Sequence, residues 1–444
     1  MIVQKHFTTL TIATALTSIS TQAIAQSDSI CLIDQRFSRV DLYPVGEHPG
    51  QVELADLDQD GYLDAVVLNR TAGSFTVLLG DPSGAFTHLT EIPTGQLPTA
   101  QEFDDIDHDG DTDLLIVDAE TDEITIFLND GNAGFVEHSR VEVGERSRSI
   151  KVADFNNDGY TDIVCTHHQY QIDDPTIEIL LGGPNITFAE PFGLYDDMHT
   201  NDVSIADFNN DGNADIAALE GIYPSANRGR IYLGNGNATF DDPILFNSRR
   251  STITSTVADM NNDGHLDIVS VSRIDFSVII HYGDGTGAFN DDRQIPLFVE
   301  AANVATAHLN DDDMLDIVVS YDGILIGDGG GISILESRSN GSFRLNYVPN
   351  IGLSSWVAVA DLNDDGQTDF VAPARGTDSL EVFLDQCGVC PADLNGDGML
   401  DYFDVSALLN PNPGANQFLD YNLDGTTNFF DISDFLIDFQ SGCP

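Results

Sequence analysis

Lysine is almost absent from this chain. Among its 444 residues only Lys5 and Lys151 are lysines, and 17 basic residues stand against 73 acidic ones, for a formal net charge of −56. A field of that sign repels nucleic acids and anionic membrane surfaces. The composition therefore argues against a role in binding DNA or RNA.

Long hydrophobic runs are also missing. After the N-terminal segment, no stretch holds the roughly 18 unbroken apolar residues that a membrane-spanning helix needs. The N-terminus itself has the three parts of a secretory signal, namely a short basic start at Lys5 and His6, an apolar, threonine-rich stretch at 7–19 and an A-x-A cleavage motif at 23–25. We therefore expect a signal peptide at 1–25 and a chain that is secreted, extracellular or held at the cell surface.

Cysteine is scarce, with five residues in the chain. Cys31, Cys387, Cys390 and Cys443 lie near expected domain edges, which suits disulfides in an oxidising compartment. We predict the pairs Cys390–Cys443 and Cys31–Cys387; the alternative, Cys387–Cys390, would close a tight loop. Cys165 lies inside an expected strand and is predicted to be a buried thiol.

Motifs of catalysis are missing as well. The chain has no G-x-S-x-G, no H-E-x-x-H and no glycine-rich phosphate loop. His167 and His168 could be half of a transition-metal or acid/base site, although two loop histidines at the end of a strand are the favoured interpretation. We therefore name no catalytic residue, and an enzyme is the less favoured reading.

One acidic motif, D-x-[DN]-x-D-G-x-x-D, is repeated along most of the chain. Neighbouring copies begin 49–53 residues apart, and a period of about 50 residues is typical of solenoids and propellers. Six full copies begin at Asp56, Asp105, Asp154, Asp207, Asp259 and Asp361, and a degenerate copy begins at His308. Seven similar units in phase predict a closed ring.

Each full copy is also a cage for a hard divalent cation. Calcium takes six to eight oxygen ligands, which positions 1, 3, 5 and 9 and the backbone carbonyl at position 7 can supply, while glycine at position 6 permits the sharp turn. The expected side-chain ligands are Asp56, Asp58, Asp60 and Asp64; Asp105, Asp107, Asp109 and Asp113; Asp154, Asn156, Asp158 and Asp162; Asp207, Asn209, Asp211 and Asp215; Asp259, Asn261, Asp263 and Asp267; and Asp361, Asn363, Asp365 and Asp369. In the degenerate copy His308 replaces the first carboxylate and Asp313 the glycine, so this site is expected to be empty or weak.

The segments beside these loops are strands rather than the helices of an EF-hand. They are short and β-branched, and each repeat supplies four of them; in the first repeat they are expected at 52–55, 63–68, 75–79 and 86–92. Four antiparallel strands in a repeat of this length make a propeller blade. The seventh repeat ends after three strands, so the run at 36–45 is expected to complete it and close the ring. The predicted fold is all-β, a seven-bladed β-propeller at 26–386.

The repeat resembles a known family. The loop followed by L-G-[DN]-G-x-G-x-F is similar to the FG-GAP/VCBS repeat, the integrin-α type of β-propeller, over about residues 36–386. The resemblance implies an extracellular protein with a role in binding or adhesion. Some members of the family are attached to enzymes, and a few propellers of similar shape are lyases or lectins.

Residues 387–444 have a different pattern, with two twelve-residue calcium loops that each run into a helical stretch. Their expected ligands are Asp393, Asn395, Asp397, Asp401 and Asp404, and Asp420, Asn422, Asp424, Asn428 and Asp431. The pair resembles a dockerin domain, a small α-helical calcium-binding module, which implies a cohesin-like partner. The aromatic pairs 402–403 and 429–430 stand where dockerins often have Ser or Thr; they indicate either a different partner or core packing.

The propeller topology predicts one variable face. The calcium loops and the third-to-fourth turns share one face, so the irregular second-to-third turns and the connections between blades form the other, which suits it for binding. The expected ligand-binding residues there are Arg70, Arg146, Arg148, Arg228, Arg249, Arg250, Arg273 and Arg375, with Tyr170, Tyr223, Tyr321 and Trp356 for stacking on sugar rings. Guanidinium groups match carboxylate and sulfate groups. The alternative is that these arginines pair with acidic neighbours and merely relieve self-repulsion.

The leading functional hypothesis is therefore a secreted calcium-binding module for adhesion or binding, which recognises acidic polysaccharide on this face and is anchored through the dockerin-like domain. The alternative is a polysaccharide-degrading enzyme, a lyase or glycoside hydrolase, acting on the same face. A third possibility is a structural cell-surface protein with no small ligand. The expected partner is an extracellular glycan or a surface protein. Ca²⁺ is the expected cofactor in each case.

Overall fold

The computed structural model describes residues 36–37, 40–167, 176–194, 200–221, 228–249, 251–310, 312, 314–322, 330–338, 341–348 and 352–385. They belong to one compact unit, Ile33–Asp385. The predicted signal peptide, the dockerin-like segment with its ten calcium ligands, and Cys31, Cys387, Cys390 and Cys443 lie outside the described residues, as do Tyr170, Tyr223, Arg250 and Asp313. No helix in the described ranges is long and apolar enough to cross a membrane.

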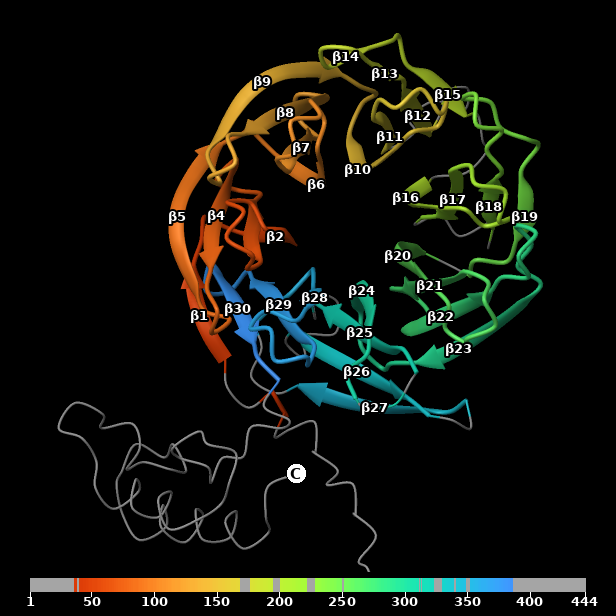
Figure 1. Ribbon diagram of the computed structural model, residues 1–444. Coiled ribbons are helices and arrows are strands. Elements are labelled where there is room, and N and C mark those ends of the chain that lie inside the picture. Colours follow the sequence, from red (N-terminus) through yellow and green to blue (C-terminus); the bar gives the residue numbers. More distant parts are fainter. Residues whose placement is uncertain are drawn as a thin grey trace, which may run out of the picture. The chain divides into compact units, whose positions relative to one another are not determined.

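Within these ranges the strands form seven four-stranded antiparallel sheets arranged around a ring (Figure 1). Blades 1 and 2 consist of β2 (Pro49–Ala55), β3 (Asp64–Asn69), β4 (Ser74–Gly80) and β5 (Phe86–Pro93), and of β6 (Pro98–Asp104), β7 (Asp113–Asp118), β8 (Glu123–Asn129) and β9 (Phe135–Glu142). Blades 3 and 4 consist of β10 (Ser147–Ala153), β11 (Asp162–His167), β12 (Ile177–Leu180) and β15 (Phe192–Leu194), and of β16 (Thr200–Ala206), β17 (Asp215–Glu220), β18 (Gly229–Tyr232) and β19 (Ile244–Phe246). Blades 5 and 6 consist of β20 (Thr252–Ala258), β21 (Asp267–Ser272), β22 (Ser277–Tyr282) and β23 (Asp291–Pro296), and of β24 (Ala301–Ala307), β25 (Asp316–Tyr321), β26 (Gly331–Ser337) and β27 (Phe343–Val348).

Blade 7 closes the ring with strands from both ends of the domain. It consists of β28 (Ala358–Ala360), β29 (Asp369–Ala374), β30 (Ser379–Phe383) and β1 (Val40–Pro44), in the order β1-β30-β29-β28. β1 pairs antiparallel with β30, from Val40 opposite Phe383 to Pro44 opposite Ser379. The predicted seven-bladed propeller, with its missing strand supplied from before the first loop, is therefore confirmed.

A buried ion pair stabilises the closure of the ring. Nε of Arg36, just before β1, lies 3.2 and 3.0 Å from the carboxylate oxygens of Asp385, just after β30, and its Nη2 also donates to that carboxylate. The Arg36 side chain is 4% exposed and that of Asp385 is fully buried. Phe37 adds an aromatic contact to Phe370 of β29, with ring centroids 4.6 Å apart. The two chain ends of the ring are thus held by side chains as well as by strand pairing.

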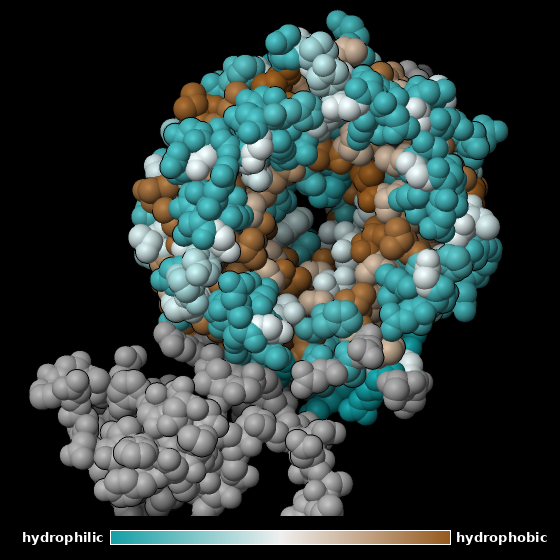
Figure 2. Space-filling view, in the orientation of Figure 1, coloured by the Kyte–Doolittle hydropathy of each residue, from teal (hydrophilic) through white to brown (hydrophobic). Residues whose placement is uncertain are grey.

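The hydrophobic core lies between neighbouring blades. In the cluster between blades 1 and 2, for example, Phe75 of β4 packs edge-on against Phe127 of β8 and Phe135 of β9. The middle strands are apolar on both faces because each blade is covered by a neighbour on either side. Figure 2 shows hydrophilic residues over most of the rim and hydrophobic ones nearer the central opening.

Blade 3 differs from the regular pattern. The segment before its outermost strand forms a small hairpin of β13 (Gly182–Gly183) and β14 (Thr187–Phe188), so Phe188 lies in this hairpin and the fourth strand is the short β15. The turn of the hairpin carries Asn185 and Ile186 with positive φ, 60° and 53°. In blade 1 the outermost strand directly follows the third-to-fourth turn, whereas in blade 3 this hairpin lies between the third strand and the outermost one.

Candidate functional site

The acidic loops join the first two strands of each blade, and their backbones fold around the first aspartate. In blade 1 the Asp56 carboxylate accepts N–H bonds from Asp60 (3.1 Å) and Gly61 (3.0 Å), and Asp58 accepts one from Asp60 (3.2 Å). The same bonds recur in blades 3, 4, 5 and 7 around Asp154, Asp207, Asp259 and Asp361. The side-chain oxygens at positions 1 and 3, a carboxylate followed by a carboxylate or an amide, thus accept hydrogen bonds from the backbone of their own loop.

Two positions of every full loop have a left-handed backbone. Position 4 has φ between 56° and 63°, and the glycine at position 6 has φ between 84° and 97°. A side chain at Gly61 would meet nothing within 4 Å, so the requirement for glycine is conformational rather than steric. This alternation bends the chain into a compact turn, as position 6 of a calcium loop requires.

The aspartate at position 9 begins the second strand and is fully buried in all seven blades. Asp64 accepts the N–H of Leu57 (2.9 Å) from its own loop and that of Gly80 (2.8 Å), where the third-to-fourth turn begins. Burial, which outweighs these two hydrogen bonds, raises the pKa of Asp64 to about 6. The pKa of its counterparts is likewise raised, to about 6 or, for Asp369, about 7.

These loops fit a hard cation. In blade 1 the ligand atoms of Asp56, Asp58 and Asp64 lie within 4.8 Å of one another, and Asp105, Asp107 and Asp113 are arranged alike in blade 2. In the described ranges no ion pair joins an arginine or lysine to any of these carboxylates. Several converging carboxylates, one of them buried and with a raised pKa, are the environment that a bound divalent cation would neutralise.

The loops also connect neighbouring blades. The backbone N–H of Ala133, in the third-to-fourth turn of blade 2, donates to the carbonyl of Leu57 (3.0 Å), in the acidic loop of blade 1. Ala238 donates in the same way to Phe155, and Gly287 to Phe208. An ion that stiffened one loop would therefore also stabilise its contact with the next blade.

The degenerate loop of blade 6 keeps part of this arrangement. Asp316 still accepts the N–H of Leu309 (3.2 Å), and Asp312 accepts that of Met314 (3.0 Å). The imidazole of His308 lies with Nδ1 3.1 Å from the carbonyl oxygen of Met314. The expectation of a weak or empty site here remains a prediction.

Three of the predicted ligand-binding arginines occupy one repeat position on the variable face. Arg70, Arg273 and Arg375 directly follow the second strand of blades 1, 5 and 7. Their backbone N–H groups donate in the same way to carbonyls of the segment before the inner strand, those of His48 (3.1 Å), Ser251 (3.3 Å) and Leu353 (3.0 Å) respectively. A fourth, Arg148, is the second residue of the inner strand β10.

These four arginines, which we call the arginine ring, act on one another electrostatically. Burial and then the positive charge of Arg148 lower the pKa of Arg70. Burial and then Arg70, with a smaller contribution from Arg273, lower the pKa of Arg375 despite the opposing charge of Asp322. The buried Nε atoms of Arg70, Arg273 and Arg375 have no hydrogen-bond partner. Arg273 is also paired with Asp322 and lies near Glu300, so its charge is partly compensated.

The channel holds a second charged cluster. Lys151 Nζ lies 2.5 Å from Glu102 Oε2, and the charges of Glu102, Glu53 and Asp202 raise the pKa of Lys151 although burial opposes them. Burial raises the pKa of Glu53 well above its usual value, and those of Glu102 and Asp202 also lie above theirs. Lys151 and Asp202 line a cavity of about 180 Å³ together with Arg148 and Trp356.

Two of the predicted ligand-binding arginines are paired with acidic neighbours. Arg249 is paired with Asp292 of β23 (2.7 Å), and Arg273 is paired with Asp322 (2.7 Å), the contacts that relief of self-repulsion would produce. Tyr321 ends β25 and is half-buried. Arg146 precedes β10 and Arg228 precedes β18, both at the variable face. Ligand binding by any of these residues remains a prediction.

Sequence reasoning missed the channel carboxylates. Glu53, Glu102 and Lys151 each stand three residues before the first aspartate of their loops, so all three occupy one repeat position on the inner strand. Comparing repeats position by position, rather than motif by motif, would have placed them together.

The comparisons with known proteins agree with this architecture. The profile of the FG-GAP-like repeat matches residues 105–165, 207–270 and 259–319. The chain carries FG-GAP-like repeats. Two similar solved structures are crystal structures of BBS1N in complex with ARL6DN, one soaked with mercury and one with lead. They have TM-scores of 0.54 and 0.52, share 10% sequence identity, and cover 79% and 78% of this chain and 96% and 95% of theirs. No curated protein matches the chain. At that identity the likeness concerns the fold alone.

Proposed function

We propose that this protein is a secreted, calcium-binding module that recognises acidic polysaccharide through the variable face of its propeller. The observation that carries the proposal is the arginine ring, Arg70, Arg148, Arg273 and Arg375, in a chain with a formal net charge of −56. Besides burial, Arg148 lowers the pKa of Arg70, and Arg70 and Arg273 lower the pKa of Arg375, so these positive charges repel one another. An anionic ligand would relieve that repulsion.

The chemistry of the ring suits uronate or sulfate groups. A guanidinium offers two parallel N–H donors that match a carboxylate or sulfate. Trp356, which lines the cavity between Arg148 and the neighbouring inner strands, offers an aromatic surface for a sugar ring. The local reversal of charge would also concentrate a polyanion at this face.

Calcium would have a structural role in this protein. When bound, it would neutralise the converging carboxylates of the six full loops and stiffen the turns that hold neighbouring blades together. The residues that would hold it in blade 1 are Asp56, Asp58, Asp60 and Asp64. Binding therefore depends on calcium through the rigidity of the ring rather than through contact between ion and glycan.

Export and anchoring complete the proposal. A signal peptide at 1–25 would direct the chain out of the cell, and the dockerin-like segment at 387–444 would attach it to a cohesin-like partner. The two calcium loops of that segment would order it for binding. The propeller would then present its variable face to an extracellular glycan or surface protein.

A second candidate, a polysaccharide lyase or hydrolase, has one observation in its favour. The carboxylates of Glu53 and Glu102 interact with the ammonium of Lys151, and both have a raised pKa, as a general acid requires. Asp202 and Lys151 line one cavity. Binding without cleavage remains the favoured function, because attraction to the charge of Lys151 already explains why the three carboxylates lie close together.

A panel of purified polysaccharides separates these functions. Binding of uronate or sulfated chains, without new reducing ends or unsaturated products, is expected for the binding module, and chelation should abolish it. Accumulating cleavage products would favour the enzyme. Equal binding of neutral chains would contradict the role of charge, and a blank panel would leave the structural surface protein as the better account.

A further inference from the structure

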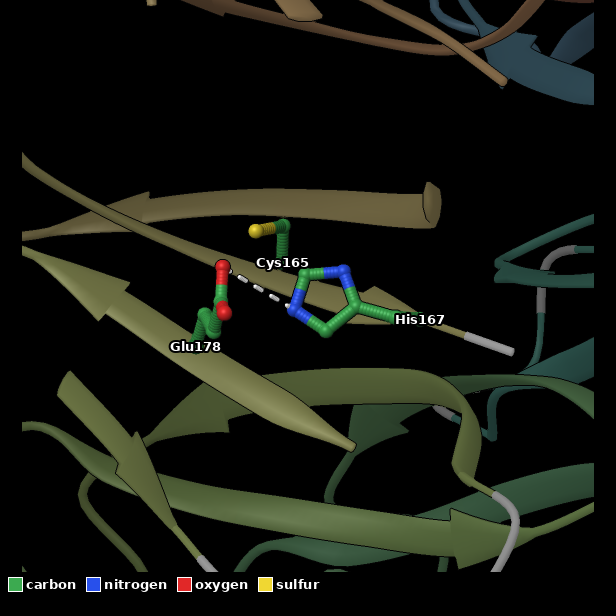
Figure 3. A group of neighbouring side chains, drawn as sticks. All are labelled: Cys165, His167 and Glu178. Carbon is green, nitrogen blue, oxygen red and sulfur yellow. Dashed lines mark ion pairs between the residues drawn. The ribbon is translucent and has the colours of Figure 1, made fainter. Parts of the chain in front are cut away.

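Three side chains that bind transition metals converge inside blade 3, away from the acidic loops. Cys165 and His167 lie two residues apart on β11, so both point to the same face of the sheet. Glu178 of β12 is directly opposite Cys165 in the register and shares that face. One ligand atom from each side chain lies within 4.8 Å of the other two, and Figure 3 shows sulfur, imidazole and carboxylate facing one another.

The neighbouring hydrogen bonds determine which imidazole nitrogen is free. Ser147 Oγ donates its only proton to the carbonyl oxygen of Gly144 (3.0 Å), so it accepts from Nδ1 of His167, which lies 3.0 Å away. Nδ1 therefore carries the proton in the neutral ring, and Nε2 presents its lone pair. A histidine that ligates a metal through one nitrogen is held through the other in this way.

That lone pair has no proper partner. Nε2 lies 3.2 Å from Oε2 of Glu178, a distance suited to an ion pair, but it makes no hydrogen bond and is buried. His167 is only 4% exposed. A lone pair facing a carboxylate inside the protein is repulsive unless a cation lies between them. A proton could serve His167 and Glu178, but it would not account for the sulfur of Cys165 beside them.

We propose that Cys165, His167 and Glu178 bind one divalent transition-metal ion, of the class of Zn²⁺. Thiolate, imidazole and carboxylate together suit such an ion, whereas calcium prefers oxygen ligands alone. Three protein ligands leave a fourth position for water or another small donor. This proposal is independent of the acidic loops and of the arginine ring.

Gly144, which lies beside the three side chains, favours such a site. The N–H of Gly144 donates to Glu178 Oε2 (3.0 Å), and a side chain at Gly144 would lie 3.0 Å from atoms of the His167 ring. Gly144 therefore positions the Glu178 carboxylate through a hydrogen bond and, because it has no side chain, also leaves room for the imidazole. Gly144 and Glu178 also line a cavity of about 700 Å³, so one of the three ligands stands at the wall of a cavity.

Cobalt(II) provides a direct test, because a cobalt–thiolate bond has a charge-transfer absorption that oxygen ligands do not produce. The full-length mature protein is stripped with chelator, saturated with Ca²⁺ and titrated with Co²⁺ alone. We expect one equivalent to produce that absorption and a tetrahedral visible spectrum, and Zn²⁺ to displace it. Cys165→Ser should remove the absorption, whereas His308→Gln, which changes a histidine in the degenerate loop, should leave it intact.

Two further variants address the geometry. Glu178→Gln keeps the thiol and should weaken Co²⁺ binding at least tenfold, and Ser147→Ala, which only releases the imidazole, should weaken it by about 10–100-fold while the absorption is retained at saturation. The proposal fails if the unaltered protein shows no thiolate absorption, a result that needs no variant to fold. It also fails if folded Glu178→Gln protein binds Co²⁺ as tightly as the unaltered chain.

Discussion

The closure of the ring provides a sharp test of what holds the propeller together. Replacing Arg36 with leucine would remove the guanidinium whose Nε and Nη2 donate to the fully buried carboxylate of Asp385. Breaking one side of a buried ion pair costs about 3–5 kcal/mol. Against a typical free energy of unfolding of about 5–15 kcal/mol, that is a large fraction of the stability of the fold.

The assay is urea denaturation of the mature protein in saturating Ca²⁺, followed by tryptophan fluorescence from Trp356. A matched control is Arg140→Leu, because Arg140 pairs with Glu123 and Glu137 on the outer surface, where all three side chains are 29–45% exposed. Exposed pairs of this kind contribute about 0–1 kcal/mol. The double variant Arg36→Leu with Asp385→Leu should recover much of the loss. Equal losses for Arg36→Leu and Arg140→Leu would refute the role assigned to the buried pair.

Three further predictions follow from the loops, the channel and the cysteines. Chelation should lower the melting temperature sharply, because each loop that binds calcium only when folded contributes about 2.7 kcal/mol at a hundredfold excess over its dissociation constant; Asp207→Ala should therefore cost more stability than His308→Ala, and calorimetry showing equal costs would contradict this. The pKa of Glu53 is raised by burial and then by Glu102, and Lys151 offsets this only in part. Its contribution to stability is therefore present below its usual pKa of 4.5 and is lost as the pH rises through the raised value. Glu53→Gln, which mimics the protonated form, should lose less stability than the unaltered protein as the pH is raised, and parallel curves of stability against pH would argue against the raised pKa. Non-reducing peptide mapping should find Cys390–Cys443 and Cys31–Cys387, whereas a Cys387–Cys390 peptide would show that the domain ends are not linked.

Much of the propeller could be predicted because its signals are local and repeated. The strand expected at 86–92 is β5 (Phe86–Pro93), and the one expected at 75–79 is β4 (Ser74–Gly80), since turn residues and alternating side chains mark both. Closure could also be predicted, because a seventh repeat with three strands needs a fourth. Blade 3 departs from the pattern because a turn at Asn185 and Ile186 inserts a hairpin before the outer strand.

Some of the candidate sites could likewise be predicted from the sequence, and others could not. Each acidic loop is a contiguous motif, so its ligands can be read from spacing alone. The Cys165–His167–Glu178 cluster cannot, because it depends on the register between β11 and β12. The motif also does not reveal the second role of the position-9 aspartates, whose contacts with the third-to-fourth turns link distant parts of a blade.

The arginine ring is the central claim of the proposed function, and one titration tests it most directly. An oligosaccharide of uronic acids is titrated into the mature, calcium-saturated protein and into Arg70→Gln with Arg375→Gln, at low and high salt, beside the control Arg140→Gln. We predict binding by the unaltered protein and the control that weakens with salt, and binding by the double variant that is at least tenfold weaker with an unchanged melting temperature. Binding by the double variant as tight as that of the control would contradict the account.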